Sequence, residues 1–334
     1  MEPTQPAADI LSTARVFALP MVTRFRQVTV REGVLLSGPA GWAEFAPFRD
    51  YDDIACVPWL LAAVDSARHR WPAALRQQIE VNTTVPVVPP AQAHTLVLAS
   101  GCRTAKVKVA DPGTEPAADA DRLAAVRDAL GQDGRIRIDA NAGWTPTEAI
   151  KLIPALAAAA GGLEYVEQPC RTVAELAAVR AGVDVLIAAD ESIRLATDPL
   201  AVARAGAADI GIIKVAPLGG VAAALRIAEQ VRAESGMQIV VSSALDTAVG
   251  LAAGLAAAGA LPDLPYACGL GTASLLAEDV VADRPLPVRG RLPVPSRAPR
   301  PDRIDEVGAD KDVTRYWLER LHRAAELAGS TGRL

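Results

Sequence analysis

The sequence predicts an α/β fold, in which an eight-stranded parallel β/α barrel carries a small α+β domain built from both chain ends. Between about Glu80 and Thr272, short runs rich in Val and Ile alternate with Ala- and Leu-rich stretches of helical spacing. Eight such runs can be recognised, and eight parallel strands are enough to close a barrel. The segments before and after this region lack the alternation, so we expect them to form a separate domain.

The eight predicted strands are short and mostly apolar. They are residues 80–88, 104–110, 135–141, 163–169, 185–192, 209–216, 238–245 and 266–272. The helices predicted between them include 119–131, 146–159, 172–181, 219–235 and 246–258. A doubly wound open sheet would also alternate strands and helices, but it normally opens with a glycine-rich phosphate turn, and none follows the first strand.

The N-terminal flank has the pattern of an antiparallel meander followed by a helix. Residues 14–48 contain alternating apolar runs, which are broken at Glu32–Gly33 and at the Gly38–Gly41 turn. A helical region is predicted over 52–79. We therefore expect residues 1–79 to belong to a capping domain.

The C-terminal flank is predicted to complete this capping domain. Its closely spaced prolines forbid a continuous helix or a central strand, so 283–304 should be an extended connection. It leads to a helix over 311–327, whose apolar face is formed by Val313, Trp317, Leu321 and Ala324. The predicted division assigns 1–79 with 285–334 to the capping domain and 80–284 to the barrel.

Composition excludes several classes of protein. The 334 residues carry a net charge of −5, with no basic excess to neutralise phosphates, so nucleic acid is not an expected partner. No run reaches the roughly 20 apolar residues of a membrane span, and no leader pattern opens the chain, so we expect a cytoplasmic protein without a membrane partner. The four cysteines lack metal or redox spacing, and we expect reduced thiols.

Charged residues close four consecutive predicted strands. Asp139, Glu167, Asp190 and Lys214 stand one β/α unit apart, so they should lie at the same height around the barrel. Three desolvated carboxylates would repel one another unless a cation sits among them. Since all the donors are hard oxygens, without His or Cys beside them, this pattern favours Mg²⁺.

A pair of lysines lies on the second predicted strand. Lys106 and Lys108 are two residues apart, so both point to one face, and inside a barrel their repulsion should lower at least one pKa toward neutrality. A lysine tuned in this way can act as a general base. Lys214 should face the pair across the cavity, where it could stabilise an enolate.

Each of these residues has an ordinary structural interpretation when it is taken alone. A strand-terminal carboxylate is commonly a loop cap, Lys106 and Lys108 could lie on a solvated edge strand, and Lys214 could extend to the surface. These interpretations do not explain all six groups at unit spacing within apolar strands. Ser242 and Ser243 could equally bind a ligand or cap the next helix, and the Gly269–Thr272 loop could hold an anion or simply turn.

Together these motifs resemble the muconate-lactonizing subgroup of the enolase superfamily. The motifs are KVKVA, RIDANAGW, EYVEQPC, AADES, IKVAPLGG, SSALDTAVG and GLGT, and the resemblance spans nearly the whole chain. It implies a (β/α)₇β TIM-like barrel with an α+β capping domain. It also implies a lyase that removes water from a succinyl-substituted hydroxycyclohexadiene carboxylate to leave an aromatic acid.

The resemblance also implies roles for single residues. Asp139, Glu167 and Asp190 would hold Mg²⁺, with Mn²⁺ as a substitute, and Lys108 would remove the α-proton while Lys106 tunes it and Lys214 stabilises the enolate. A flexible loop near Pro20–Arg26 would close over the site. Substrate contacts would come from Asn141, Ser242, Ser243, Gly269, Gly271, Thr272 and Arg24, with Arg26 as an alternative to Arg24.

Besides the lyase, two other functions remain open, a racemase and a non-catalytic binding protein. An N-acylamino acid racemase of the same superfamily would use the same lysines, one on each side of its substrate. A dipeptide epimerase is disfavoured, because Gly269–Gly271 replaces the Asp-x-Asp that would hold an α-ammonium. A non-catalytic metabolite-binding barrel would not need all six charged groups. The expected partner is a small carboxylate substrate, and the resemblance favours a monomer.

Overall fold

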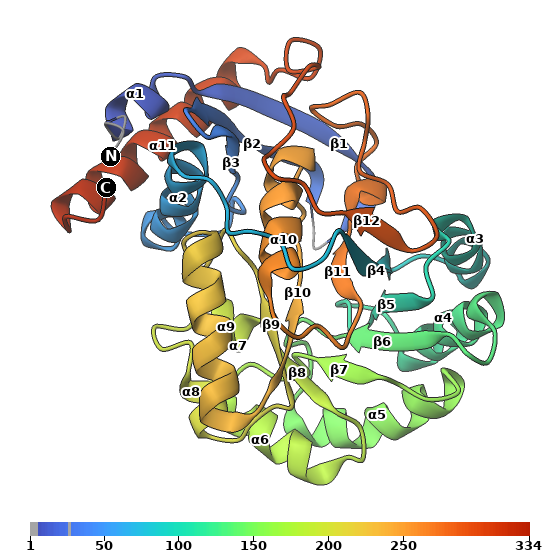
Figure 1. The fold of residues 1–334 in the computed structure, drawn as a ribbon. Coiled ribbons are helices and arrows are strands. Elements are labelled where there is room, and N and C mark those ends of the chain that lie inside the picture. The colour runs from blue at the N-terminus through green and yellow to red at the C-terminus, as the bar shows by residue number, and fades with distance from the viewer. Residues whose placement is uncertain (1–5, 26–27) are drawn as a thin grey trace.

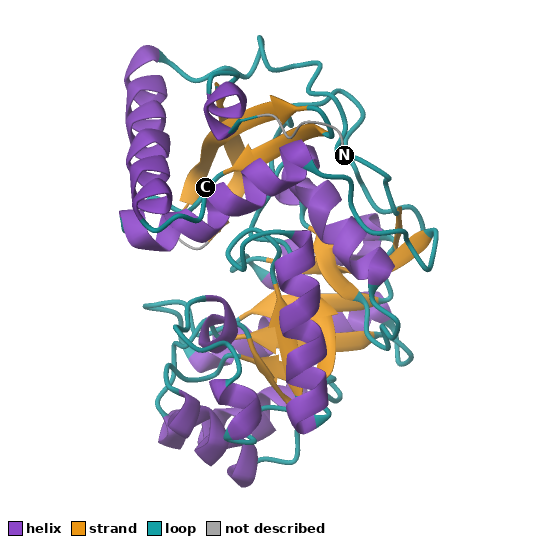
Figure 2. Cartoon of the chain, turned by 60° about the vertical axis from the view of Figure 1, so that its left-hand side comes forward, coloured by secondary structure: helices purple, strands orange, loops and turns teal. Residues whose placement is uncertain are grey.

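The computed structural model describes residues 6–25 and 28–334 (Figure 1). It contains a parallel barrel and, across one end of it, a capping domain whose sheet and helices lie above the barrel in Figure 2. The hydrophobic interior follows the same division, with one large cluster inside and around the barrel and a second one in the capping domain.

Eight parallel strands form the barrel, as predicted. They are β4 (Gln78–Val85), β5 (Thr104–Lys108), β6 (Arg135–Asp139), β7 (Tyr165–Glu167), β8 (Ile187–Ala189), β9 (Ile210–Ile213), β10 (Gln238–Val241) and β11 (Cys268–Gly271). Their order is β10-β9-β8-β7-β6-β5-β4-β11, and an isolated parallel bridge between Ser242 and Gly269 joins the two ends of the sheet. The short strand β12 (Arg291–Pro293) pairs antiparallel with β4.

The connections between the barrel strands are helical. They comprise α3 (Pro90–Ser100), α4 (Pro116–Leu130), α5 (Pro146–Ala159), α6 (Val173–Gly182), α7 (Glu191–Arg194), α8 (Ala201–Arg204), α9 (Val221–Ser235) and α10 (Ala248–Ala260), and a 3₁₀ turn, η1 (Ala273–Leu275), follows β11. Helices α5 and α6 begin with capping boxes, in which Thr145 and Thr172 bond the amides of Glu148 and Glu175. Helix α3 is an addition to the predicted helices and starts at a proline, the residue best suited to a first helical position.

The capping domain combines both chain ends. It contains α1 (Ala7–Leu11), β1 (Arg15–Phe25), β2 (Val28–Gly38), β3 (Gly41–Phe45), α2 (Asp53–Arg68) and α11 (Lys311–Ser330). The meander is antiparallel, as expected, but strand β2 continues through Glu32–Gly33, where the sequence predicted a break. Gly33 packs against the ring of Phe17 and the methyl group of Ala46, so it serves close packing rather than a turn.

Two further boundaries differ from the predictions. Helix α2 ends at Arg68, so the helical region predicted over 52–79 is too long, because the chain turns extended at His69. Helix α11 extends to Ser330, and its predicted apolar face is buried at Trp317, Leu321 and Ala324. The proposed division at 79/80 and 284/285 stays a prediction.

Polar contacts attach the capping sheet to the barrel. Glu44 of β3 accepts hydrogen bonds from the backbone N–H groups of Thr247 (3.0 Å) and Gly250 (3.2 Å) at the start of α10. The buried Arg31 of β2 donates to the carbonyl of Leu245 (2.9 Å). Burial and the charge of Asp246 raise the pKa of Glu44 to about 7. The sheet is thereby fixed over the end of the barrel where parallel strands finish.

Two sequence-based expectations concern the whole chain. All four cysteines are free and buried, which agrees with the expected reduced thiols. Within residues 6–25 and 28–334, the structure contains no helix long and apolar enough to cross a membrane. The apolar, Ala- and Gly-rich stretch 248–260 forms α10, which is almost entirely buried against the rest of the protein.

Trp317 is expected to anchor the capping domain. Its side chain is 1% exposed, packs edge-on against Phe45, and donates from Nε1 to Glu32 (3.0 Å). We expect Trp317→Ala to lower the free energy of unfolding by about 3–5 kcal/mol, measured by urea denaturation. The neighbouring Leu318 is 40% exposed, so Leu318→Ala should cost less than about 1 kcal/mol. Equal losses in the two variants would contradict this role.

Candidate active site

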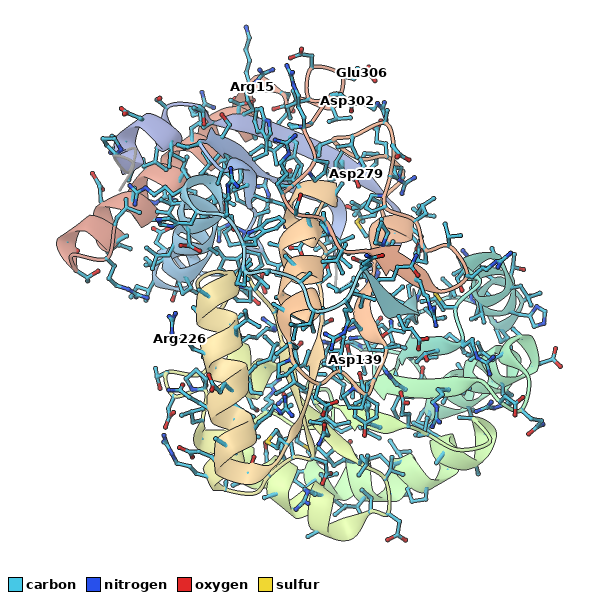
Figure 3. The ribbon with its side chains drawn as sticks, viewed as in Figure 1. Arg15, Asp139, Arg226, Asp279, Asp302 and Glu306 are labelled. Carbon is cyan, nitrogen blue, oxygen red and sulfur yellow. The ribbon has the colours of Figure 1, made fainter. Side chains whose placement is uncertain are left out.

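The predicted charged residues meet at the carboxyl ends of neighbouring barrel strands. Lys108, at the end of β5, is in register with Asp139 at the end of β6, and Asp139 is in register with Glu167 at the end of β7. Asp190 and Lys214 follow β8 and β9 directly. Figure 3 labels Asp139 in the interior of the molecule, among the barrel strands. The strand register therefore brings the six groups to one end of the barrel, as expected.

Each carboxylate is paired with a lysine. Lys106 Nζ donates to both oxygens of Glu167 (2.9 and 3.0 Å), and it lies 3.3 Å from Asp139 Oδ2. Lys108 Nζ donates to Asp139 Oδ2 (2.5 Å), and Lys214 Nζ donates to Asp190 Oδ2 (2.6 Å). All six side chains are buried. Buried charges are tolerated only when they are paired in this way, so three positive and three negative groups balance one another.

This pairing shifts the pKa values of the carboxyl groups in different directions. Burial opposes ionisation of Asp139, but the ammonium groups of Lys108 and Lys106 outweigh it and hold the pKa well below its usual range. Arg194 and Lys214 do the same for Asp190. Burial and the charge of Asp139 raise the pKa of Glu167 to about 7.

Lys106 is not the lysine whose pKa is lowered, and the expected lowering of at least one lysine pKa stays a prediction. Burial would lower the pKa of this ammonium group, but the charges of Glu167 and Asp139 raise it above its ordinary value. The prediction considered only the repulsion between the two lysines. The carboxylates of Glu167 on β7 (2.9 Å) and Asp139 on β6 (3.3 Å) contact Lys106 Nζ directly and reverse the sign of the shift.

Asn141 connects Lys108 to its surroundings. Its Oδ1 accepts a hydrogen bond from Lys108 Nζ (2.6 Å), and its backbone N–H donates to Asp139 Oδ1 (3.0 Å). The residue has a φ of 45°, a left-handed conformation that Asn adopts more readily than most residues. The turn after β6 therefore directs the side-chain amide oxygen of Asn141 toward Lys108.

A small cavity opens above these ion pairs. Its lining consists of Phe25, Phe48, Thr84, Lys106, Lys108, Asp139, Asn141, Lys214, Ser242, Ser243, Ala244, Leu245, Gly269 and Thr272. Glu167 and Asp190 are buried outside this lining. All three lysines thus reach one cavity, and β5 and β9 bring them to it from different sides of the barrel.

Most of the predicted substrate-contact residues reach this cavity. Ser242, Gly269 and Thr272 line it, whereas Gly271 lines a neighbouring pocket and its backbone packs against Asn82, so a substrate contact of Gly271 stays a prediction. Ser243 also lines the cavity, but its hydroxyl bonds Asp246 (2.9 Å) in the turn before α10. This is the capping interpretation that the sequence left open.

The segment predicted to be a closing loop is a strand up to Phe25. Strand β1 covers Pro20 to Phe25, because its backbone pairs with β2, and Arg26 lies outside the described residues. Arg24 forms an ion pair with Asp111 (3.1 Å) and lines a wider opening beside Lys108. Arg24 therefore stands at the mouth of the site rather than in the cavity with the lysines.

Sequence reasoning did not name five of the residues that line the cavity, namely Phe25, Phe48, Thr84, Ala244 and Leu245. The ring of Phe25 lies 5.1 Å from Lys108 Nζ, Phe48 closes another side, and Thr84 comes from the end of β4. Within the described part of the chain, the buried hydroxyls of Thr84 and Thr272 have no hydrogen-bond partner. Phe25 lies within the segment near Pro20–Arg26 that the resemblance placed over the site, whereas no local pattern marks the contact of Phe48.

The donor set fits a hard divalent cation on chemical grounds. The candidate ligands are three buried carboxylates, and the cavity is not lined by His or Cys. In the present arrangement each carboxylate bonds a lysine, and no three Asp, Glu, His or Cys side chains of the described residues converge into a metal-binding cluster. A cation would therefore have to replace lysine partners at these oxygens.

Comparisons with known proteins agree with this fold and site. Residues 90–299 match the model for enolase C-terminal domain-like proteins, and residues 16–67 match the model for enolase N-terminal domain-like proteins. The chain is 53% identical to an o-succinylbenzoate synthase from Thermobifida fusca, covering 93% of this chain and 96% of the relative. It is 50% identical to one from Mycobacterium ulcerans, covering 94% and 93%.

A solved structure supports the same fold. The dipeptide epimerase from Enterococcus faecalis, complexed with Mg and the dipeptide L-Leu-L-Tyr, superimposes with a TM-score of 0.71 at 23% identity, covering 85% of this chain and 96% of that one. The barrel, the capping domain and these matches make the chain a member of the enolase superfamily, whose members use a divalent metal ion. Within this superfamily, the chain belongs to the o-succinylbenzoate synthase family, whose members are lyases.

Metal affinity should depend on the ionisation of Glu167. A cation binds the carboxylate form, and the pKa of Glu167 is raised to about 7, so we expect affinity for Mn²⁺ to fall as the pH is lowered from about 8 to about 6. Electron paramagnetic resonance of free Mn²⁺ measures this. Glu167→Gln should bind weakly at every pH in this window, while the exposed Glu229→Gln should keep the wild-type profile. A wild-type affinity independent of pH would contradict the assignment.

Proposed function

We propose that this protein catalyses the Mg²⁺-dependent syn dehydration of 2-succinyl-6-hydroxy-2,4-cyclohexadiene-1-carboxylate to 2-succinylbenzoate, a step of menaquinone biosynthesis. The observation that carries the proposal is the cavity shared by Lys108, the last residue of β5, and Lys214, which follows β9. Two lysines on different sides of one cavity suit a substrate that loses a proton to one neutral amine and gathers negative charge beside the other, charged one. The identity to named o-succinylbenzoate synthases supports the choice of substrate.

We assign the six charged groups as follows. Asp139, Glu167 and Asp190 would hold the cation, for which Mg²⁺ is the first choice and Mn²⁺ a substitute, because both accept oxygen ligands. When bound, the cation would supply positive charge beside the developing enolate. Lys106, which bonds Glu167 in the present arrangement, would keep a positive charge beside Lys108.

The chain's own residues account for the proton transfers. Lys108, in its neutral form, takes the α-proton, and the negative charge that develops on the substrate carboxylate is stabilised by Lys214. Lys108 then returns a proton to the departing hydroxyl group, so a C–H and a C–O bond break, a double bond forms and water leaves. Asn141 orients Lys108 through its 2.6 Å hydrogen bond. The reaction is favourable because it creates an aromatic ring.

The remaining lining residues would bind and enclose the substrate. Thr84 and Thr272 offer buried hydroxyls that can donate to a carboxylate or carbonyl oxygen, and Ser242 lies beside them in the lining. Phe25 and Phe48 would exclude water above Lys108. Arg24, at the mouth, would attract a substrate that carries two carboxylates.

Racemisation of N-succinylamino acids is the second candidate function. It needs a lysine on each side of the α-carbon, and the arrangement of Lys108 and Lys214 meets this requirement equally well. We further propose that the protein acts as a cytoplasmic monomer on a small carboxylate, without a nucleic acid partner. The net charge of −5 supports the last point.

An ultraviolet assay tests the proposed reaction directly. With purified protein and the cyclohexadiene carboxylate, we expect the diene absorbance to fall in the presence of Mg²⁺ and to stay constant after EDTA treatment. Racemisation of an N-succinylamino acid, followed in parallel by polarimetry, should be slower. Fast racemisation with negligible dehydration would overturn the proposed substrate while leaving the metal site and the lysines in place.

Removing the proposed base should abolish turnover without unfolding the barrel. We expect Lys108→Ala to lower kcat by at least about a hundredfold, because general-base catalysis contributes roughly 10²–10⁴. The exposed Lys151 on α5 provides the matched control, and Lys151→Ala should keep wild-type turnover. Circular dichroism should show native secondary structure in both variants. Wild-type turnover in Lys108→Ala would remove the lysine from the mechanism.

A further inference from the structure

We propose that Arg194 is a positioning residue that fixes Asp190 for cation binding, and that Tyr51 of the capping domain completes this arrangement. Affinity of the site for a divalent cation then depends on the capping domain. The inference rests on the proposed metal site and adds two residues that the sequence analysis did not single out.

Arg194 bonds three groups at once. It is the last residue of α7, and its side chain is 1% exposed. Nε donates to Asp190 Oδ1 (2.9 Å), Nη2 donates to Glu191 Oε1 (2.5 Å), and Nη1 donates to the hydroxyl of Tyr51. A planar guanidinium can reach three acceptors in fixed directions, whereas a lysine offers a single ammonium group.

The two oxygens of Asp190 are divided between two partners. Arg194 bonds Oδ1, and Lys214 bonds Oδ2 (2.6 Å). Gln168 adds a further contact, because its Oε1 accepts from the backbone N–H of Asp190 (2.9 Å). The carboxylate therefore cannot rotate freely, and Oδ2 is the oxygen turned toward the lysine at the cavity. Partners of this kind orient metal ligands in known sites.

Tyr51 connects this arrangement to the capping domain. Its ring packs edge-on against Phe48 (5.7 Å between centroids) and Trp59 (6.3 Å), and its carbonyl accepts a hydrogen bond from Arg320 of α11 (2.5 Å). A shift of the capping domain would therefore move the tyrosine hydroxyl, and with it the guanidinium of Arg194.

The same guanidinium also acts on the surroundings of Lys108. Glu191, which bonds Arg194, accepts a hydrogen bond from Asn141 Nδ2 (3.4 Å), and Asn141 Oδ1 accepts from Lys108 Nζ (2.6 Å). A continuous series of hydrogen bonds thus runs from the capping domain to both a proposed metal ligand and the proposed base.

If Arg194 acts through its charge, its loss should strengthen cation binding. If it acts by positioning Asp190, its loss should weaken cation binding. A positive charge beside Asp190 repels a cation, so charge alone predicts tighter cation binding when the arginine is neutralised. If the arginine acts by holding the carboxylate, binding weakens in every variant that breaks the bond, whether or not the charge remains. Arg194→Gln and Arg194→Lys separate these effects.

The experiment is a Mn²⁺ titration without substrate, read by electron paramagnetic resonance, on the full-length protein. We expect Arg194→Gln and Arg194→Lys to bind Mn²⁺ about tenfold or more weakly, and Tyr51→Phe to bind a few-fold more weakly. Two matched controls should keep wild-type affinity. Arg180→Gln breaks an ion pair with Asp209 (2.8 Å), and Arg303→Gln breaks one with Glu306 (2.8 Å), and neither pair includes Asp190 or Tyr51.

Each outcome decides the proposal. Unchanged or tighter Mn²⁺ binding in folded Arg194→Gln overturns it, as does an equal weakening in the controls. If circular dichroism shows that the Arg194 variants do not fold, Tyr51→Phe decides, because it removes only a hydroxyl group. If the wild-type protein itself binds no Mn²⁺, the proposed metal site is wrong and this inference falls with it. If the wild type binds and all variants match it, only this inference is wrong.

Discussion

Three buried lysine–carboxylate pairs at the end of the barrel are the constraint on which the rest of the structure depends. Moving unpaired charges out of water costs far more than the net stability of a domain, so each group must find its partner within hydrogen-bond distance. The parallel register of β5, β6 and β7 meets this requirement, because it places Lys108 beside Asp139 and Asp139 beside Glu167. A change of strand register would therefore be penalised electrostatically as well as by packing.

The capping domain determines how strongly these charges interact. Phe25 and Phe48 cover the cavity, and Tyr51 reaches Arg194 behind Asp190. Excluding water strengthens every charge–charge contact beneath, and it also raises the cost of leaving any group unpaired. The same cover that makes the site reactive thus makes its geometry intolerant of a missing partner.

The sequence predicted the barrel and the six charged groups because both follow local rules. Strand-terminal residues such as Asp139 and Lys214 recur at the spacing of one β/α unit, which can be read from the chain alone. Gly33 was misinterpreted, because a glycine needed for close packing and a glycine needed for a turn look the same in a sequence. The raised pKa of Lys106 could not be anticipated, because the carboxylate that it bonds lies on a strand 61 residues away.

Contacts between distant segments were beyond the reach of sequence patterns. Tyr51 and Arg194 are 143 residues apart, and neither stands in a repeat or motif that marks a contact. Phe48 reaches the cavity only because the capping domain is packed over the barrel. Their positions follow from the packing of the two domains, and no property of their own segments contains that information.

The construction of the capping domain from both ends of the chain has a consequence for biosynthesis. Trp317 of α11 packs against Phe45 of β3, and Arg320 holds the carbonyl groups of Phe48 and Tyr51. A ribosome releases the barrel strands well before α11, so the apolar surface of the capping domain that α11 covers has no cover until translation is nearly complete. The barrel can therefore fold early, while the cover over the ion pairs is added last, and this interval is when the emerging chain is most exposed to aggregation and to chaperones.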